Sequence, residues 1–264
     1  MNMQNKNLKF YLIGLLFVGV LSTIGFIIYY SFNSGQFVMS IQTPNVVSYD
    51  LRIAETSDFE QMHFELSASA EVDALGITYS AINVNDIVMS DGIFRDDEHT
   101  YLAYSFFIMN SGTTNITIDY HMRLVEVMYG MDEFVRILVI EDDENYTMYQ
   151  KEDHEDDQGQ LPTYVDLPAS VHFESWNIIF SDSFSEFRPG DVKSFRVIVW
   201  LESQDPDLDS SFFEGSLKSI MTFRIRNTEQ EISLSNETFE LDNASLWIPL
   251  TTICSVTFEI SSES

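Results

Sequence analysis

Residues 187 to 207, FRPGDVKSFRVIVWLESQDPD, show the clearest alternation of side chains in the chain. Successive side chains of a β-strand point to opposite faces. One face of this strand then carries Phe195, Val197, Val199 and Leu201, and the other carries Arg196, Ile198 and Trp200. Because both faces are largely apolar, we expect other parts of the protein to cover both of them.

Further strand patterns follow one another along the chain, with polar turns between them. We expect strands at residues 37–43, 46–53, 60–68, 101–110, 115–129, 134–140, 146–151 and 215–226, and two or three more between 231 and 260. Two pairs have the pattern of a hairpin, one joined at Gly112 and the other at the acidic turn 141–145. Residues 71–92 are ambiguous, and the acidic run 151–162 predicts a solvated loop.

About ten or eleven strands without an internal repeat or a Gly/Ser linker predict an all-β protein, with one jelly-roll-like antiparallel β-sandwich over residues 33–264. The composition agrees, because 14% of the residues are aromatic and the chain has only 11 Gly and 6 Pro. Such a composition suits a half-buried pleated surface better than a helical bundle.

The amino-terminal segment carries a different pattern. Residues 10–32, FYLIGLLFVGVLSTIGFIIYYSF, form an uncharged run of about 23 residues, long enough for one helix to cross a bilayer. Lys6 and Lys9 precede it, so the positive-inside rule places residues 1–9 in the cytoplasm. We expect an uncleaved signal anchor in the cell membrane, single-pass, with residues 33–264 outside. Cleavage between Ser31 and Gly35 is the alternative.

The charge is unevenly distributed about this run. The chain has 13 Lys and Arg against 42 Asp and Glu, which gives a formal net charge of -29. All the acidic residues follow the run, since the first of them is Asp50. A surface this acidic argues against nucleic acid as a partner and indicates a soluble surface outside the membrane. The lipid bilayer, contacted through residues 10–32, is the expected partner.

Calcium is the more plausible of the two metal ions for which the sequence offers candidate ligands. Asp205, Asp207 and Asp209 alternate around Pro206 in the corner that ends the strand described above. A turn that brings carboxylate oxygens together provides the ligands that Ca²⁺ prefers. The same pattern is also an ordinary turn, and it lacks the spacing of an EF-hand. The single Cys254 cannot form an intramolecular disulfide, and such a thiol is more often a small buried apolar group than a nucleophile.

Histidine patterns give little support to an enzyme. The five histidines do not form H-E-x-x-H or H-x-x-E-H, and the chain has no G-x-S-x-G or phosphate-binding loop. The tripeptide HFE occurs at 63–65 and at 172–174, where His and Glu share a strand face and could ligate zinc. The alternative, which we favour, is that these polar residues face solvent beside an inward Phe64 or Phe173.

An exposed aromatic side chain would instead indicate ligand binding. Antiparallel sandwiches also form carbohydrate-binding modules, and these present Trp or Tyr on one face. Of the three tryptophans, Trp176 in the polar segment FESWN is the best candidate for such a platform. A ligand- or carbohydrate-binding sensory ectodomain is therefore the alternative function, and burial of every tryptophan would weaken it.

Four segments together resemble a known family. YLAYSFFIMNSG, DEFVRILVI, FRPGDVKSFRVIVWLESQDPD and GSLKSIMTFRI, in this order, are similar to the TasA/camelysin family of surface and biofilm-matrix proteins of Gram-positive bacteria and their relatives. The resemblance covers about residues 93–226, and the last 38 residues look like an addition to it. Ser203 and Leu208 stand where the family pattern has Gly and Cys.

The resemblance implies a jelly-roll fold and, for the better-known members, assembly into extracellular fibres after cleavage of the amino-terminal segment. Some relatives have been classed as metallopeptidases. With an anchor retained, we expect a non-enzymatic, membrane-anchored surface or matrix protein, with other surface proteins or copies of itself as further partners. A zinc metallopeptidase is the third and least favoured alternative.

Overall fold

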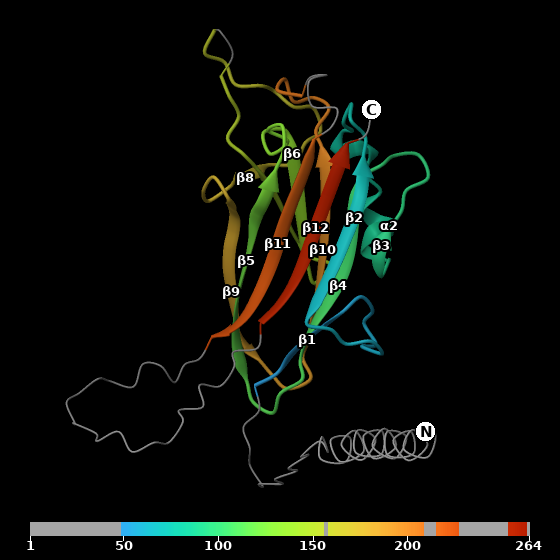
Figure 1. Ribbon diagram of the computed structural model, residues 1–264, viewed down its shortest axis with the longest axis vertical. Helices are drawn as coiled ribbons and strands as arrows, with labels where there is room; N and C mark the ends of the chain where they lie inside the picture. The colour runs from blue at the N-terminus through green and yellow to red at the C-terminus, as the bar shows by residue number, and fades with distance from the viewer. Residues whose placement is uncertain (1–48, 156–157, 209–214, 227–252, 263–264) are drawn as a thin grey trace, which may run out of the picture. The chain divides into compact units, whose positions relative to one another are not determined.

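Two β-sheets packed face to face make up the described part of the chain (Figure 1). The computed structural model describes residues 49–155, 158–208, 215–226 and 253–262. These residues belong to the compact unit Val47–Ser264. The expected cytoplasmic segment 1–9 and anchor 10–32 lie outside the described residues. Within the described ranges, no helix has the length and apolar character needed to cross a bilayer.

The larger sheet, sheet A, has seven strands, and sheet B has five. Sheet A contains, in spatial order, β1 (Leu51–Ala54), β4 (Leu102–Asn110), β10 (Val192–Leu201), β6 (Val135–Glu141), β7 (Asn145–Gln150) and β8 (Ser170–His172), and β3 (Gly92–Phe94) also pairs with β4. Sheet B contains β2 (Glu65–Val72), β12 (Ile253–Ser262), β11 (Ser216–Arg226), β5 (Ile116–Val127) and β9 (Ile178–Phe187). The expected all-β sandwich is therefore confirmed. The expected strand at 37–43 and those expected between 231 and 250 lie outside the described residues.

The main core lies between the two sheets. Phe106 and Phe195 of sheet A stack with ring centroids 5.4 Å apart, and Phe223 of sheet B packs against both rings. The four residues expected on one face of β10 all belong to this core. Alternation in sheet B follows the same rule, because β5 and β11 bury every second residue along most of their length.

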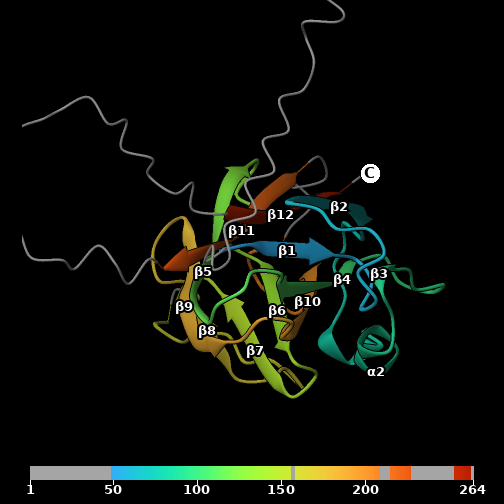
Figure 2. The ribbon, with the colours of Figure 1, turned by 90° about the horizontal axis from the view of Figure 1, so that it is seen from below.

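A second core covers the outer face of sheet A. Ile198 and Trp200, from the other face of β10, pack with residues of the segment 77–88. This segment includes the 3-10 turn η1 (Tyr79–Ala81) and the short helix α2 (Val84–Val88). Seen end-on in Figure 2, α2 lies beyond sheet A, on the side away from β11 and β12. The prediction that both faces of the strand are covered is thus confirmed, and the ambiguous residues 71–92 supply the cover.

The two expected hairpins have different outcomes. β6 and β7 pair antiparallel through the turn 141–145, as expected. The hairpin across Gly112 is wrong, because β4 belongs to sheet A and β5 to sheet B. The side chain of buried Asn110 stabilises the crossing, since its amide group donates to the carbonyl oxygens of Thr114 and Phe187 at 2.9 and 2.8 Å.

Strand direction also differs from the expectation. Most pairs are antiparallel, but β2 pairs with β12, and β7 with β8, in parallel, so both sheets are mixed. Of the last 38 residues, which lie beyond the family resemblance, the described strand β12 is placed within sheet B between β2 and β11. Its buried residues Cys254, Val256, Phe258 and Ile260 belong to the main core.

Candidate functional site

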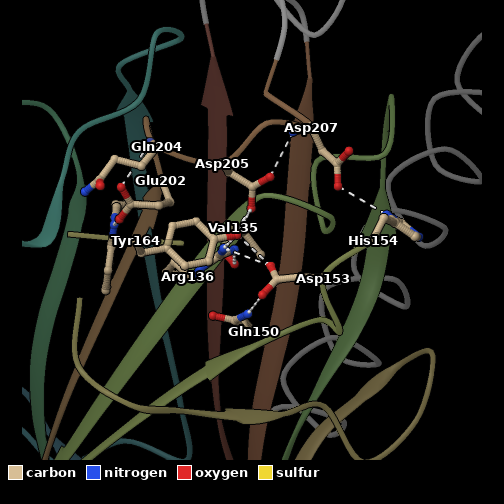
Figure 3. Close-up of polar contacts among 11 residues, drawn as sticks. Val135, Arg136, Gln150, Asp153, His154, Tyr164, Glu202, Gln204, Asp205 and Asp207 are labelled. Atoms are coloured by element: carbon tan, nitrogen blue, oxygen red, sulfur yellow. Dashed lines mark hydrogen bonds and ion pairs between the residues drawn. The ribbon is translucent and has the colours of Figure 1, made fainter. Parts of the chain in front are cut away.

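The acidic corner that follows β10 is built around a buried arginine. Arg136 of β6 lies opposite Trp200 in the sheet and is 0% exposed. Its guanidinium donates to Asp205 Oδ2 at 2.7 Å, while Asp205 Oδ1 accepts the backbone N–H of Asp207 at 2.9 Å (Figure 3). A buried charge needs a partner of opposite sign, so Asp205 neutralises the arginine and shapes the corner at the same time.

The loop after β7 supplies further partners for this arginine. Tyr164 Oη accepts a hydrogen bond from Arg136 at 3.0 Å and donates one to Asp153 Oδ1 at 2.6 Å. Asp153 Oδ2 accepts from the side-chain amide of Gln150 at 3.0 Å. Burial and the hydrogen bond to Asp153 raise the pKa of Tyr164, so it stays a neutral donor. The acidic run, predicted as a solvated loop, is therefore anchored at Asp153.

The same corner also covers the end of the second core. Trp200 is 0% exposed, and its indole N–H donates to Glu202 Oε2 at 3.2 Å. The other carboxylate oxygen of Glu202 accepts the backbone N–H of Gln204 at 3.2 Å. Trp200 is consequently a core residue with a satisfied polar group, and it offers no surface to a ligand.

The residues of the candidate calcium site face protein donors. Asp205 is engaged with Arg136 and the backbone, and Asp207 Oδ2 lies 3.1 Å from His154 Nδ1. Asp209 lies outside the described residues. Over the described ranges, no group of three or more His, Cys, Asp or Glu side chains is placed to hold a metal ion. Calcium binding stays a prediction, and the positions of Asp205 and Asp207 add no support to it.

A hollow of about 310 Å³ lies next to this corner, with Trp176 at its edge. Trp176 belongs to the connection between β8 and β9, and its side chain is 80% exposed. The lining consists of Glu133, Lys151, Glu152, His154, His172, Phe173, Ser175 and Trp176. His154 belongs to both the hollow and the acidic corner after β10, because it lines the hollow and contacts Asp207 of the corner.

The cationic groups of this hollow already face carboxylates. Lys151 Nζ contacts Asp132 and lies 2.8 Å from Glu133 Oε1. Burial alone would lower the pKa of Lys151, but the hydrogen bonds and charges of these two acids outweigh it and raise the pKa. The hydrogen bond and the charge of Asp207 likewise raise the pKa of His154. The hollow therefore holds hydrogen-bonding groups whose positive charge is largely compensated.

A larger hollow, of about 510 Å³, lies where the edges of the two sheets meet. β2 and β12 line one side, and the segment from Ile93 to Tyr101 lines the other. Asp96 shapes this segment by accepting the backbone N–H groups of Glu98 and His99 and the hydroxyl of Tyr101, at 2.8, 3.1 and 3.0 Å. The role of Asp96 in these hydrogen bonds is to form the turn.

The two HFE segments differ from each other. Phe64 is 44% exposed and lies under the guanidinium of Arg52, so the expectation that it points inward is wrong. Phe173 does pack against the main core. His172 is exposed, and Glu174 accepts hydrogen bonds from the backbone and the hydroxyl of Ser181. Cys254 is buried, and burial raises its pKa to about 12, which makes it a poor nucleophile at neutral pH.

The buried network around Arg136 is the part of this region that the sequence analysis missed. A signal was present, because Arg136 is the one charged residue within the apolar strand FVRILVI. A charge in a strand buried on both faces must find an acidic or hydroxyl partner. The partners themselves lie 28 and 69 residues away along the chain, so the strand pattern does not identify them.

Comparison with known proteins gives only distant likenesses. No family model matches the chain, and no curated protein matches it. Among solved structures, the N-terminal domain of PorA is similar over 81% of this chain and 97% of its own, with 10% identity and a TM-score of 0.31. The CooA pilin subunit of enterotoxigenic Escherichia coli is similar over 81% and 99%, with 6% identity and a TM-score of 0.31. The adhesin CfaE of the same bacterium is similar over 83% and 51%, with 7% identity and a TM-score of 0.30. Likenesses at this level carry no conclusion about function.

Proposed function

We propose that this chain is a non-enzymatic surface protein whose β-sandwich binds a ligand outside the cell. The observation that carries the proposal is Trp176, a large aromatic side chain that is 80% exposed at the edge of a polar hollow. Most tryptophans are largely buried, and an exposed aromatic ring beside polar groups is typical of a recognition surface. Trp200, by contrast, has the burial of a purely structural residue.

Location outside the cell is the second part of the proposal. It is supported by the apolar run at residues 10–32, by Lys6 and Lys9 before it, and by the acidic residues that all follow it. The sandwich would then be tethered to the bilayer through residues 10–32. Its jelly-roll topology is part of the same proposal.

Protease treatment of intact cells tests this location. The full chain, carrying a carboxyl-terminal peptide tag, is produced in a bacterium with a single membrane. We expect added protease to remove the tag and to leave a fragment of roughly the first 35 residues, the length of one anchor and its flank. A cytoplasmic protein that stays intact is the control. A tag that is protected until the cells are lysed would overturn the proposal.

A matched variant tests the orientation. Replacing Lys6 and Lys9 with Glu removes the positive charge before the anchor, so we expect a smaller fraction of the tag to be accessible. A mature chain that begins near Gly35 and is found in the medium would mean secretion instead of anchoring.

A matrix protein of the TasA-like type is the second candidate, and the resemblance over residues 93–226 favours it. Purified chain that assembles into fibres visible by electron microscopy would support this type. Full-length chain that stays monomeric would favour the ligand-binding function.

A further inference from the structure

We infer that the hollow beside Trp176 is a carbohydrate-binding site, with a sugar ring stacked on the indole. This inference rests on the proposed ligand-binding function and names the class of ligand. A pyranose has one face of C–H groups and a rim of hydroxyls. The C–H face can stack on an aromatic ring, and the hydroxyls can form hydrogen bonds with polar side chains.

The turn that carries Trp176 is held firmly in place. Ser175 N–H donates to the carbonyl of Ile178 at 3.1 Å, and Ile178 N–H donates back to Ser175 Oγ at 3.1 Å. Phe173 N–H donates to the carbonyl of Gln150 at 2.9 Å, and the Phe173 ring packs against the main core. The indole is therefore presented on a preformed support, which lowers the entropy lost on binding.

The polar lining offers both kinds of hydrogen-bonding group. Glu133 and Glu152 accept, Lys151 donates, and the imidazole of His172 has one nitrogen for each role when it is neutral. Sugar hydroxyls need donors and acceptors side by side, because each hydroxyl can act as both. A volume of about 310 Å³ lies at the lower end of the range for ligand sites, which suits a short glycan segment.

The charges disfavour anionic ligands. Lys151 and His154 already face Asp132, Glu133 and Asp207, so an anion would compete with three carboxylates. The net charge of -29 also repels an anion at longer range. A neutral ligand with an apolar face avoids this competition.

Calorimetric titration of the full chain in nanodiscs tests the inference. Nanodiscs avoid the sugar head groups of glycoside detergents. The probes are five neutral pentasaccharides, of the cello-, chito-, xylo-, manno- and laminari- series. We expect at least one to bind with a dissociation constant on the order of 0.1 mM, which corresponds to about -5.5 kcal/mol. Empty nanodiscs supply the blank.

Variants of the platform assign the site. Trp176→Ala is expected to weaken the binding at least about ten-fold, and Trp176→Phe to weaken it less. Tyr146→Ala is the control, because Tyr146 is also an exposed aromatic residue but does not line the hollow. An unchanged melting temperature of Trp176→Ala would show that the loss of binding is not a loss of folding.

Two results would overturn the inference. One is that none of the five pentasaccharides binds, and the other is that binding is unchanged in Trp176→Ala. Neither result bears on the location of the sandwich, which the protease experiment decides separately. A tag found inside the cell would overturn the proposed function even if a glycan binds.

Discussion

Trp200 and Trp176 show how differently one residue type can be used within a single domain. Trp200 is 0% exposed, lies with its ring centroid 6.2 Å from that of Tyr79, and donates its N–H to Glu202. Trp176 projects into solvent from the turn between β8 and β9. Substitution should therefore separate the two roles, stability for the first and recognition for the second.

Trp200→Ala should lower the free energy of unfolding by about 3 to 5 kcal/mol, because it leaves a large cavity in the second core and an unsatisfied Glu202. Trp176→Ala should change it by less than about 0.5 kcal/mol. Urea unfolding followed by circular dichroism measures both. A midpoint for Trp200→Ala equal to that of the wild type would contradict the structural role.

Arg136→Ala tests the buried network in the same way. Removing the arginine leaves Asp205 buried without its main partner, so we expect a loss of about 3 to 5 kcal/mol. The matched control is Arg226→Ala, whose ion pair with Asp119 is exposed to solvent and is therefore expected to contribute far less to stability. If both variants unfold at the same denaturant concentration, the network is not a stabilising centre.

His154 gives a prediction about pH. Asp207 raises the pKa of His154 above its ordinary value of 6.5, so the protonated form is favoured in the folded state. The stabilisation is fully present below pH 6.5 and is lost as the pH rises through the folded pKa. Titration by nuclear magnetic resonance should find a pKa above 6.5 in the wild type and a lower one in Asp207→Asn. Equal values in the two proteins would mean that the pair does not form in solution.

At the scale of secondary structure, the connection between β4 and β5 decides how the two sheets are joined. Asn110 is buried, and its side chain bonds to Thr114, Phe187 and the N–H of Gly112. These contacts stabilise the segment that crosses from sheet A to sheet B, together with backbone hydrogen bonds from Asn110 to Asp191 and from Ser111 to Asp50.

Asn110→Ala should lower the free energy of unfolding by about 2 to 4 kcal/mol, because it leaves buried carbonyl oxygens without their donors. Asn145→Ala, at the exposed end of the β6–β7 hairpin, should have an effect within about 0.5 kcal/mol. Thermal unfolding of the two variants side by side provides the measurement. A mild effect at Asn110 would mean that water replaces its hydrogen bonds.

Strand positions could be predicted from the sequence because alternation is a local property. The pattern of Phe195, Val197 and Val199 against Ile198 and Trp200 implied two covered faces, and a core lies on each face of β10. Apart from the local β6–β7 hairpin, strand partners could not be predicted, since a pairing such as that of β4 with β10 depends on contacts far apart in the chain. The candidate site, too, could be predicted only in part. Polar neighbours indicated an exposed Trp176, whereas the partners of Arg136 come from two distant loops.

For the molecule as a whole, the dominant property is its charge. With a formal net charge of -29, the folded protein repels itself more than the expanded chain does. Added sodium chloride should therefore raise the melting temperature by screening. Acidification toward the isoelectric point of about 4.1 should reduce the same repulsion and lower solubility.

Calcium gives a separate test at this scale. If Asp205, Asp207 and Asp209 bind it, low millimolar CaCl₂ should raise the melting temperature beyond a sodium chloride control of equal ionic strength, by mass action. Scanning calorimetry compares the two. Identical melting curves would remove the calcium site and leave only screening.

The position of β12 has a consequence for the order in which the molecule can be completed. A ribosome delivers β2 early, yet in sheet B the strand that pairs with β2 is β12, which spans Ile253–Ser262. Residues 73–252 lie between the two strands, so β2 is synthesised long before the strand with which it pairs. Sheet B is therefore complete only after β12 has been synthesised, and until then the partner strand of β2 is missing.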